Sequence, residues 1–170
     1  MCLVLFAWHT RPDLPLVVAA NRDEFYARPT EPLRRWDDGF VAGRDLLAGG
    51  TWMGISDALR FAAVTNVRDG APATGAPSPG DLPVAFPRGR LSPADHAGQV
   101  AATGAEYGSF NLLVGDPAEL WWVTNRPHGR RLRVEPGVHG LSNAELDTPW
   151  PKVTGGKHAC AAALTAGDGS

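Results

Sequence analysis

The sequence predicts an α+β domain whose sheets are largely antiparallel. Short apolar segments of strand length follow one another along the chain, and the few helical segments stand apart from them. The 170 residues include 20 glycines and 15 prolines, a content that favours many turns and few long helices. A chain of this length suits one domain, because two domains would each have too small a core.

The first predicted element is a β-hairpin. Residues 3–8 and 15–20 are apolar runs on either side of a polar turn, and neither run alternates between apolar and polar side chains. This pattern predicts two strands that are buried on both faces. Further short strands are expected at residues 40–42, 51–56 and 61–65, where apolar side chains again lie between turn residues.

The middle of the chain is interrupted before a helix begins. Residues 69–89 contain five prolines and four glycines, so we expect a loop or a badly broken helix there. Ser92 precedes Pro93, and Asp95 follows Ser92 by three residues, which is typical of a helix start. We expect this helix to end just before Gly104.

The last third of the chain predicts strands and then a helix. Residues 110–115 and 119–124 predict a second hairpin across an Asp-Pro turn, and residues 131–134 predict one more strand. A final helix is expected after Pro151 and as far as residue 164, in an alanine-rich stretch.

Charge and hydropathy exclude several classes of partner. The chain has 16 basic and 18 acidic side chains, and this balance gives no electrostatic basis for binding nucleic acid. No apolar run reaches the roughly 18 residues of a membrane span, so no stable membrane insertion is expected. The two cysteines form no disulfide framework, which favours a reducing, cytoplasmic setting. The five histidines lack ligand spacing, so neither a metal nor another cofactor is expected.

Cys2 is the sharpest candidate for chemistry. If Met1 is removed, a thiol and a free α-amine lie on the same residue. The ordinary pKa of such an amine is about 7.7–8.0, so part of it is uncharged near neutral pH and can accept the thiol proton. A neighbouring guanidinium would lower the pKa of the thiol further. The alternative is that Cys2 is a small core side chain at the start of a strand.

Polar residues follow the second apolar run directly. In a simple hairpin the end of the second strand lies beside the start of the first, so Asn21, Arg22 and Asp23 are expected next to Cys2. Arg22 would stabilise a thiolate or a substrate carboxylate, and Asp23 would hold the α-ammonium group or orient the amine. The alternative is a surface turn in which Arg22 and Asp23 pair with each other.

Two asparagines at strand ends are candidate oxyanion donors. Asn66 follows an apolar strand, and Asn143 follows the segment His139-Gly140-Leu141-Ser142. An amide side chain donates two N–H groups without a charge, which suits an oxyanion hole. The alternative is that each asparagine caps a turn.

Ordered motifs spread over residues 1–153 carry a family resemblance. They include Met1-Cys2, Asn21-Arg22-Asp23-Glu24, Gly43-Arg44-Asp45, Gly49-Gly50-Thr51-Trp52, Thr65-Asn66, Phe110-Asn111-Leu112, Leu141-Ser142-Asn143 and Trp150-Pro151-Lys152. With these motifs the chain resembles the NRDE family, which is also named after transport and Golgi organisation protein 2.

The resemblance implies a fold and a reaction. The fold is a four-layer αββα sandwich of the N-terminal-nucleophile hydrolase type, similar to bile-salt hydrolases and penicillin V acylases. Those enzymes use an N-terminal cysteine, an arginine and an aspartate near the end of the second strand, and asparagines for the oxyanion. The matching positions, in order, are Cys2, Arg22, Asp23, Asn66 and Asn143. The implied reaction is attack on a small amide or ester through a thioester acyl-enzyme.

Two features depart from the family pattern. Prolines between residues 77 and 87 interrupt what is a continuous helix in the family, and Pro83 should shorten it. The family also extends well past Trp150-Pro151-Lys152, into further helices and a closing strand, and nothing after about residue 153 matches that region. We therefore expect residues 1–170 to form a single domain that is incomplete at its C-terminus.

Three functional hypotheses remain open from the sequence. The first is an amidohydrolase-like enzyme with Cys2 as nucleophile. The second is a non-catalytic carrier or trafficking protein, which uses the same fold to hold a haem or acyl-lipid ligand, as eukaryotic members of the family suggest. The third is a fragment from a shortened reading frame. The partner in the first two cases is a small molecule or a lipid-like or haem-like ligand.

Overall fold

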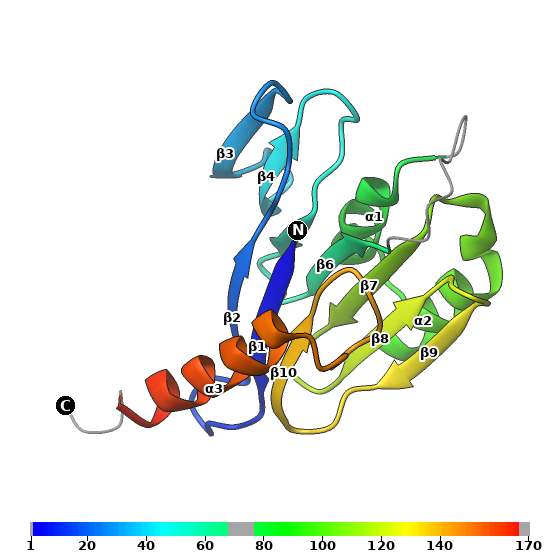
Figure 1. Cartoon of the computed structure of the whole chain (residues 1–170). Coiled ribbons are helices and arrows are strands. Elements are labelled where there is room, and N and C mark those ends of the chain that lie inside the picture. The colour runs from blue at the N-terminus through cyan, green and yellow to red at the C-terminus, as the bar shows by residue number, and fades with distance from the viewer. Residues whose placement is uncertain (1, 68–76, 167–170) are drawn as a thin grey trace.

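A computed structural model describes residues 2–67 and 77–166 of the chain (Figure 1). The strands are β1 (Leu3–Trp8), β2 (Leu16–Asn21), β3 (Thr30–Arg35), β4 (Val41–Asp45), β5 (Met53–Ile55), β6 (Phe61–Asn66), β7 (Phe110–Gly115), β8 (Leu120–Thr124), β9 (Arg130–Arg133) and β10 (Gly137–Leu141). The α-helices are α1 (Leu82–Arg88), α2 (Pro93–Thr103) and α3 (Pro151–Ala166), and short 3₁₀ turns cover Pro79–Asp81 and Gly104–Glu106.

The strands form two antiparallel sheets of unequal size. The small sheet has the order β10-β1-β2, so the first strand of the chain is its central strand. The large sheet runs β3-β4-β5-β6-β7-β8-β9 in chain order. Every strand pair in both sheets is antiparallel, which confirms the predicted α+β class with largely antiparallel sheets.

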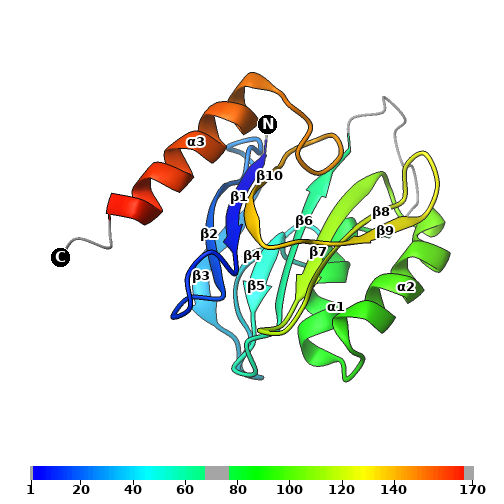
Figure 2. The ribbon, with the colours of Figure 1, turned by 90° about the horizontal axis from the view of Figure 1, so that it is seen from below.

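Helices cover the outer face of each sheet, as Figure 2 shows. Helix α3 packs on β1 and β10, whereas α1 and α2 pack on β5 to β9 of the large sheet. The approach of α3 is close, because a Cβ atom on Gly156 would lie 2.8 Å from Cδ1 of Leu5. The contacts therefore run from helix to small sheet to large sheet to helices.

Two apolar cores hold these elements together. The first lies between the sheets, where Val4, Phe6 and Trp8 of β1 pack with Leu113 and Trp122 of the large sheet. The second lies under α1 and α2 and includes buried side chains from β6, β7 and β8. Because β1 contributes side chains to the core between the sheets and is covered by α3 on its other face, its course is fixed on both sides.

The predicted hairpin is present, but one prediction about it is wrong. β1 pairs with β2 from Leu3↔Asn21 to Trp8↔Leu16. Burial on both faces holds for most of β1 only, since β2 is half-buried at residues 16–18 and exposed at Ala19, Ala20 and Asn21. The apolar run of β2 therefore lies at the edge of the small sheet rather than within it.

The interrupted middle segment contains a short regular helix. Helix α1 begins at Leu82, with Pro83 in its first turn, where a backbone N–H has no helical partner to lose. Pro87 lies one residue before its end. The prediction of a loop or broken helix is thus corrected for residues 82–88, and residues 69–76 of that prediction lie outside the described residues. Helix α2 is confirmed, with the Ser92 side chain accepting a hydrogen bond from the Asp95 N–H.

The sequence prediction missed β3, and it anticipated β10 only as the strand end before Asn143. An ionic cluster stabilises β10. Strand β10 pairs with β1. The Gly140 N–H donates to Oδ1 of Asp147, and the Asp147 N–H donates to the Gly140 carbonyl. The Asp147 carboxylate also pairs at 2.7 Å with His139 on β10 and with Lys157 on α3. Asp147 therefore fastens α3 to the edge of the small sheet.

The acidity of Asp147 reflects this role. Partial burial by itself would raise the pKa of its carboxyl, but the hydrogen bonds from His139, Lys157 and Gly140 outweigh burial and lower the pKa to about 2. A carboxyl with a depressed pKa stabilises the folded state above its unfolded pKa of about 3.9 and loses that contribution as the pH falls through its folded pKa.

We predict that Asp147→Asn lowers the free energy of unfolding by about 1–2 kcal/mol near neutral pH, a value discounted for the partial exposure of the pair. Asparagine tolerates the left-handed backbone of this residue, where φ is +58°, so the charge is the main change. The difference between variant and parent should shrink as the pH falls from about 4 to about 2. Denaturant unfolding at several pH values measures this, and a difference that stays constant would contradict it.

Candidate functional site

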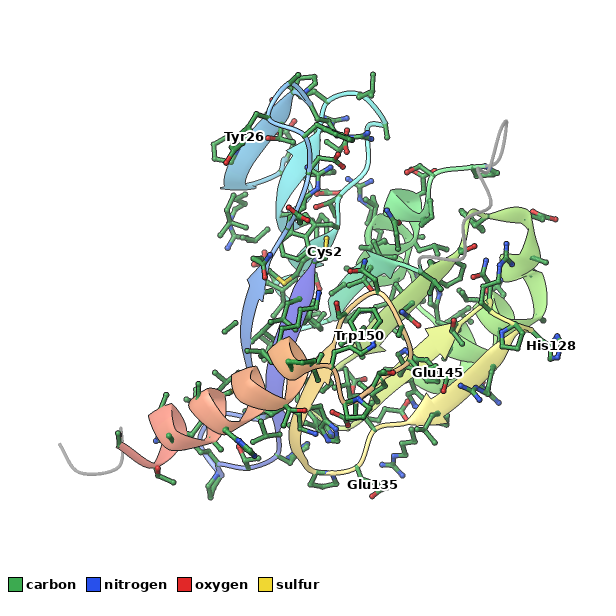
Figure 3. All side chains as sticks on the ribbon, viewed as in Figure 1. Cys2, Tyr26, His128, Glu135, Glu145 and Trp150 are labelled. Carbon is green, nitrogen blue, oxygen red and sulfur yellow. The ribbon has the colours of Figure 1, made fainter. Side chains whose placement is uncertain are left out.

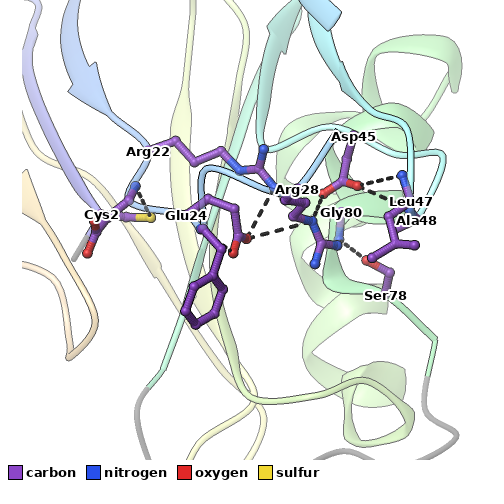
Figure 4. Close-up of polar contacts among 11 residues, drawn as sticks. Cys2, Arg22, Glu24, Arg28, Asp45, Leu47, Ala48, Ser78 and Gly80 are labelled. Atoms are coloured by element: carbon purple, nitrogen blue, oxygen red, sulfur yellow. Dashed lines mark hydrogen bonds and ion pairs between the residues drawn. The ribbon is translucent and has the colours of Figure 1, made fainter. Parts of the chain in front are cut away.

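The register of the first hairpin brings the predicted residues to Cys2. Asn21 lies opposite Leu3, so the chain leaves β2 beside the start of β1. The Asp23 backbone N–H donates to the Cys2 sulfur at 3.4 Å, as Figure 4 shows. The prediction that Arg22 and Asp23 lie next to Cys2 is therefore confirmed as a matter of position. Figure 3 places Cys2 at the end of β1 that lies nearest to β3 and β4.

Cys2 lines a pocket with a volume of about 590 Å³. Its wall includes Arg22 and Asp23 from the segment after β2, and Asn66 from the end of β6. Four of the five predicted site residues therefore share one pocket. The opposite wall comes from β3, β4 and the segment around Ser78, Pro79 and Gly80.

Asn143, the fifth predicted residue, lies behind this wall. It is only 6% exposed, and its side-chain amide donates to the backbone carbonyl of Asn66 at 2.8 Å. The contact ties the loop after β10 to the end of β6. Asn143 is therefore a neighbour of the pocket through Asn66, and its role as an oxyanion donor stays a prediction.

Two arginines beside the pocket are held by two carboxylates. The Arg22 guanidinium pairs with Asp45 at 2.7 Å and with Glu24 at 3.3 Å, and Arg28 pairs with the same Asp45 oxygen at 2.6 Å (Figure 4). These side chains come from the segment after β2 and from the end of β4. The four charges balance, so both guanidinium groups are held in place while the cluster stays neutral.

Asp45 is the anchor of this cluster. Its second oxygen accepts the backbone N–H groups of Leu47 and Ala48 at 3.0 and 3.1 Å, in the turn after β4. Burial alone would raise the pKa of Asp45, but the hydrogen bonds from Arg28 and from this turn lower it below its usual value. The residue is therefore a carboxylate at neutral pH, and its ion pair holds the Arg22 guanidinium in position.

The Cys2 thiol itself is in a half-buried setting. Burial raises the pKa of the thiol, and the positive charges of the N-terminal amino group, Arg22 and Lys152 offset only part of that rise, while Glu24 adds to it. The Cys2 carbonyl accepts hydrogen bonds from the Ser142 hydroxyl at 2.7 Å and from the Lys152 ammonium at 3.3 Å. Cys2 is thus held by its backbone carbonyl, and its side chain is a thiol at neutral pH in a residue that lines the pocket.

A buried polar network supports Ser142. The Thr65 hydroxyl donates to the Ser142 carbonyl at 2.6 Å, and the Asn111 amide donates to the Ala144 carbonyl at 2.8 Å. These contacts join β6, β7 and the loop after β10 directly beneath Cys2. The loop that carries Ser142 and Asn143 is consequently held in position by hydrogen bonds from β6 and β7.

Sequence reasoning missed several residues of the site. Arg28, Asp45, Ser142 and Lys152 all contact Cys2 or the charge cluster, yet none was predicted to act there. Asp45, Ser142 and Lys152 lie within motifs that carry the family resemblance, and Arg28 lies four residues after another; that resemblance was the available signal. Their contacts depend on how distant segments meet, and no local pattern reveals this.

Metal-binding groups and membrane-spanning helices were sought among the described residues. Within residues 2–67 and 77–166, no group of three or more His, Cys, Asp or Glu side chains is arranged to hold a metal ion. In the same part of the chain, no helix combines the length and the apolar character that a membrane crossing requires.

Comparisons with known proteins identify the relatives of this chain. The family model described as Transport and Golgi organisation 2 matches residues 1–169. The Transport and Golgi organization protein 2 homologs of Bos taurus and Homo sapiens are 35% and 33% identical, and the Drosophila melanogaster protein of that name is 27% identical. Each match covers 92% of this chain and 62% of the relative, so the chain spans less than two thirds of these relatives. The chain belongs to the Transport and Golgi organisation 2 family.

Proposed function

We propose that this chain carries an N-terminal-cysteine amidohydrolase-like site that acts on a small amide or ester. The observation that carries the proposal is the position of Cys2, which lines a pocket of about 590 Å³ together with Arg22, whose guanidinium is held by Asp45. The succession of helix, two sheets and helices supports the corresponding N-terminal-nucleophile hydrolase-like fold, and the cytoplasm is the proposed setting.

Removal of Met1 is the activating step of this proposal. It places an α-amine on Cys2, where the uncharged amine accepts the thiol proton. The resulting thiolate attacks the substrate carbonyl and gives a tetrahedral oxyanion. When that intermediate collapses, the leaving amine or alcohol takes the proton from the α-ammonium group, and a thioester remains on Cys2. Water then attacks the thioester, with the same amine as base, and releases the acid and the free thiol.

The surrounding side chains have complementary roles in this scheme. Arg22 favours the thiolate through its positive charge, and Asp45 holds Arg22 in position. Asp23 contributes its backbone N–H to the sulfur and holds the α-ammonium group with its carboxylate. Asn66 donates to the oxyanion, and Asn143 either shares that task or positions Asn66 through its hydrogen bond.

A non-catalytic carrier of haem or acyl-lipid ligands is the second candidate. The observation that favours it is the raised pKa of the Cys2 thiol, because a protonated thiol in a half-buried pocket is a poor nucleophile. In that case the pocket would hold its ligand without covalent chemistry. Saturable binding of haem or of a fatty acyl ligand that survives Cys2→Ala would support the carrier and count against the enzyme.

The enzyme predicts a processed N-terminus and a reactive Cys2. Intact mass should show that Met1 is absent, and iodoacetamide should alkylate Cys2 well before Cys160, which serves as the internal reference thiol. A panel of small amides and esters should include one that is hydrolysed, with activity falling on the order of a thousandfold or more in Cys2→Ala. Retention of Met1 in the folded chain, or hydrolysis that persists in Cys2→Ala, would overturn the mechanism.

The charge of Arg22 should be visible in the reactivity of Cys2. We predict that Arg22→Gln shifts the pH profile of Cys2 alkylation to higher pH, because loss of the positive charge raises the pKa of the thiol. Alkylation near pH 7 should be slower, by roughly threefold or more, while the rate at high pH is preserved. The measurement is iodoacetamide labelling followed by peptide mass spectrometry.

Arg28→Gln is the matched control for this prediction. It removes a guanidinium from the same cluster, but Arg28 is not among the largest influences on the pKa of the thiol. Its profile should therefore stay close to that of the parent chain. Equal shifts in the two variants would show that the cluster acts through the fold rather than through the charge of Arg22.

A further inference from the structure

Lysine is rare in this chain, and both of its lysines lie on α3. Of the 16 basic side chains, 14 are arginines, and only Lys152 and Lys157 are lysines. Lys157 pairs with Asp147 at 2.7 Å and so belongs to the ion pairs that fasten α3 to the small sheet. Lys152 has a different neighbour, because its ammonium donates to the Cys2 carbonyl at 3.3 Å. The chain therefore places one of its two lysines at the candidate site.

The packing of α3 determines where Lys152 lies. Val153, the next residue, is buried, and its Cγ1 lies 2.7 Å from the position that a Cβ atom on Gly140 of β10 would take. One turn further along the helix, Gly156 lies against Leu5 of β1. These contacts hold the first turns of α3 near the start of β1, so the Lys152 side chain reaches a residue 150 positions away in the chain.

Helix stability does not account for a lysine at this position. Lys152 is the second residue of α3, and the first turn of a helix carries a partial positive charge that disfavours cations. The side chain is half-buried, and its ammonium lies 5.4 Å from the centroid of the Trp150 ring. Its contacts with this ring and with the Cys2 carbonyl therefore hold the charge against an unfavourable local field.

Covalent geometry places this ammonium close to the backbone nitrogen of Cys2. The nitrogen and the carbonyl oxygen of one residue are three bonds apart and are separated by at most about 3.6 Å. Because the Lys152 ammonium lies 3.3 Å from the Cys2 oxygen, the two nitrogens are within about 7 Å of each other. When Met1 is removed, the Cys2 nitrogen becomes the α-amine that the proposed mechanism uses as its base.

The charged groups beside Cys2 act on that amine in opposite directions. Asp23 and Glu24 lie in the segment after β2, and a carboxylate near an amine favours its protonated form. Arg22 lies in the same segment, but its guanidinium is paired with Asp45 and Glu24. The end of β6 and the loop after β10 contribute uncharged side chains, which are Asn66, Ser142 and Asn143.

We propose that Lys152 is a positioning residue of the Cys2 site, which holds the Cys2 carbonyl and keeps the α-amine of the processed chain uncharged near neutral pH. A positive charge within about 7 Å disfavours protonation of the amine and offsets the carboxylates of Asp23 and Glu24. A base is most effective when its pKa lies near the operating pH. The inference rests on the proposed function, because the amine acts as a base only in that mechanism.

The thiol gives separate support for the reach of this charge. Lys152 is among the positive charges that lower the pKa of the Cys2 thiol. The same ammonium therefore favours the deprotonated form of both groups on Cys2, the thiolate and the uncharged amine.

The test measures the amine directly and needs no substrate. The chain is released from a cleavable N-terminal fusion so that it begins at residue 2, and every sample carries Cys2→Ser so that the thiol cannot react. Acetic anhydride labels the α-amine over a range of pH, with the ε-amine of Lys157 as the internal reference. Peptide mass spectrometry of the labelled chain then gives the pKa of the α-amine.

Lys152→Met should raise the pKa of the α-amine by about one unit, because the opposing positive charge is lost. Labelling near pH 7 should fall roughly five- to tenfold, while labelling well above the pKa stays the same. Lys152→Arg keeps the charge and should keep the parent profile, which a role in packing alone would not predict.

Lys157→Met is the matched control, with Lys152 as its reference amine. It makes the same substitution on the same helix, but Lys157 pairs with Asp147 and not with Cys2. The pKa of its α-amine should equal that of the parent. An unchanged pKa in Lys152→Met, or an equal shift in Lys157→Met or in Lys152→Arg, would overturn the role of Lys152.

Failure of this inference is distinguishable from failure of the proposed enzyme. A raised amine pKa in Lys152→Met without hydrolysis of any amide or ester would support the effect of Lys152 and count against the enzyme. Hydrolysis that requires Cys2, with an amine that Lys152→Met leaves unchanged, would support the enzyme and overturn the inference. Where a substrate is hydrolysed, the acid limb of kcat/KM should move to higher pH in Lys152→Met by about the same one unit.

Discussion

The structure depends on the placement of β1 as the central strand of the small sheet. It pairs with β2 on one side and β10 on the other, lies under α3, and sends Val4, Phe6 and Trp8 into the core between the sheets. Because all four sides are occupied, the strand cannot shift in register without exposing its core side chains. The residue just before it, Cys2, is therefore held as firmly as a core residue although it lies at the wall of a pocket.

The side chains beside Cys2 are positioned by ion pairs. Asp45 receives two backbone N–H groups from its own turn and offers its other oxygen to Arg22 and Arg28. A carboxylate held in this way loses little further conformational freedom when it binds a guanidinium, so the arginines are positioned before any ligand arrives. Within the cluster Arg22 lowers the pKa of the thiol and Glu24 opposes it with a smaller effect, while Asp45 determines where the Arg22 charge lies.

The sequence was informative where local patterns decide the structure. The polar turn between residues 8 and 15 predicted the hairpin, and the hairpin placed Arg22 and Asp23 beside Cys2. β3 was missed because Glu31, Pro32, Arg34 and Arg35 have no apolar alternation and pair only along an edge. β10 was anticipated only as a strand end before Asn143, because its glycines give it little strand signal and its partner β1 lies at the start of the chain.

The residues of the site divide in the same way, into those that local sequence predicts and those that distant contacts bring in. Cys2, Arg22 and Asp23 are close in the sheet register and could be predicted together, whereas Asp45 and Lys152 reach the site through contacts across 23 and 150 residues. The exposure of β2 could not be predicted either, because an apolar run without alternation is equally consistent with a buried strand and with an exposed edge strand. The burial of each strand depends on how many strands face it. Here β1 is the central strand of its sheet and β2 an edge strand, so the apolar run of β1 is largely buried whereas that of β2 is half-buried or exposed.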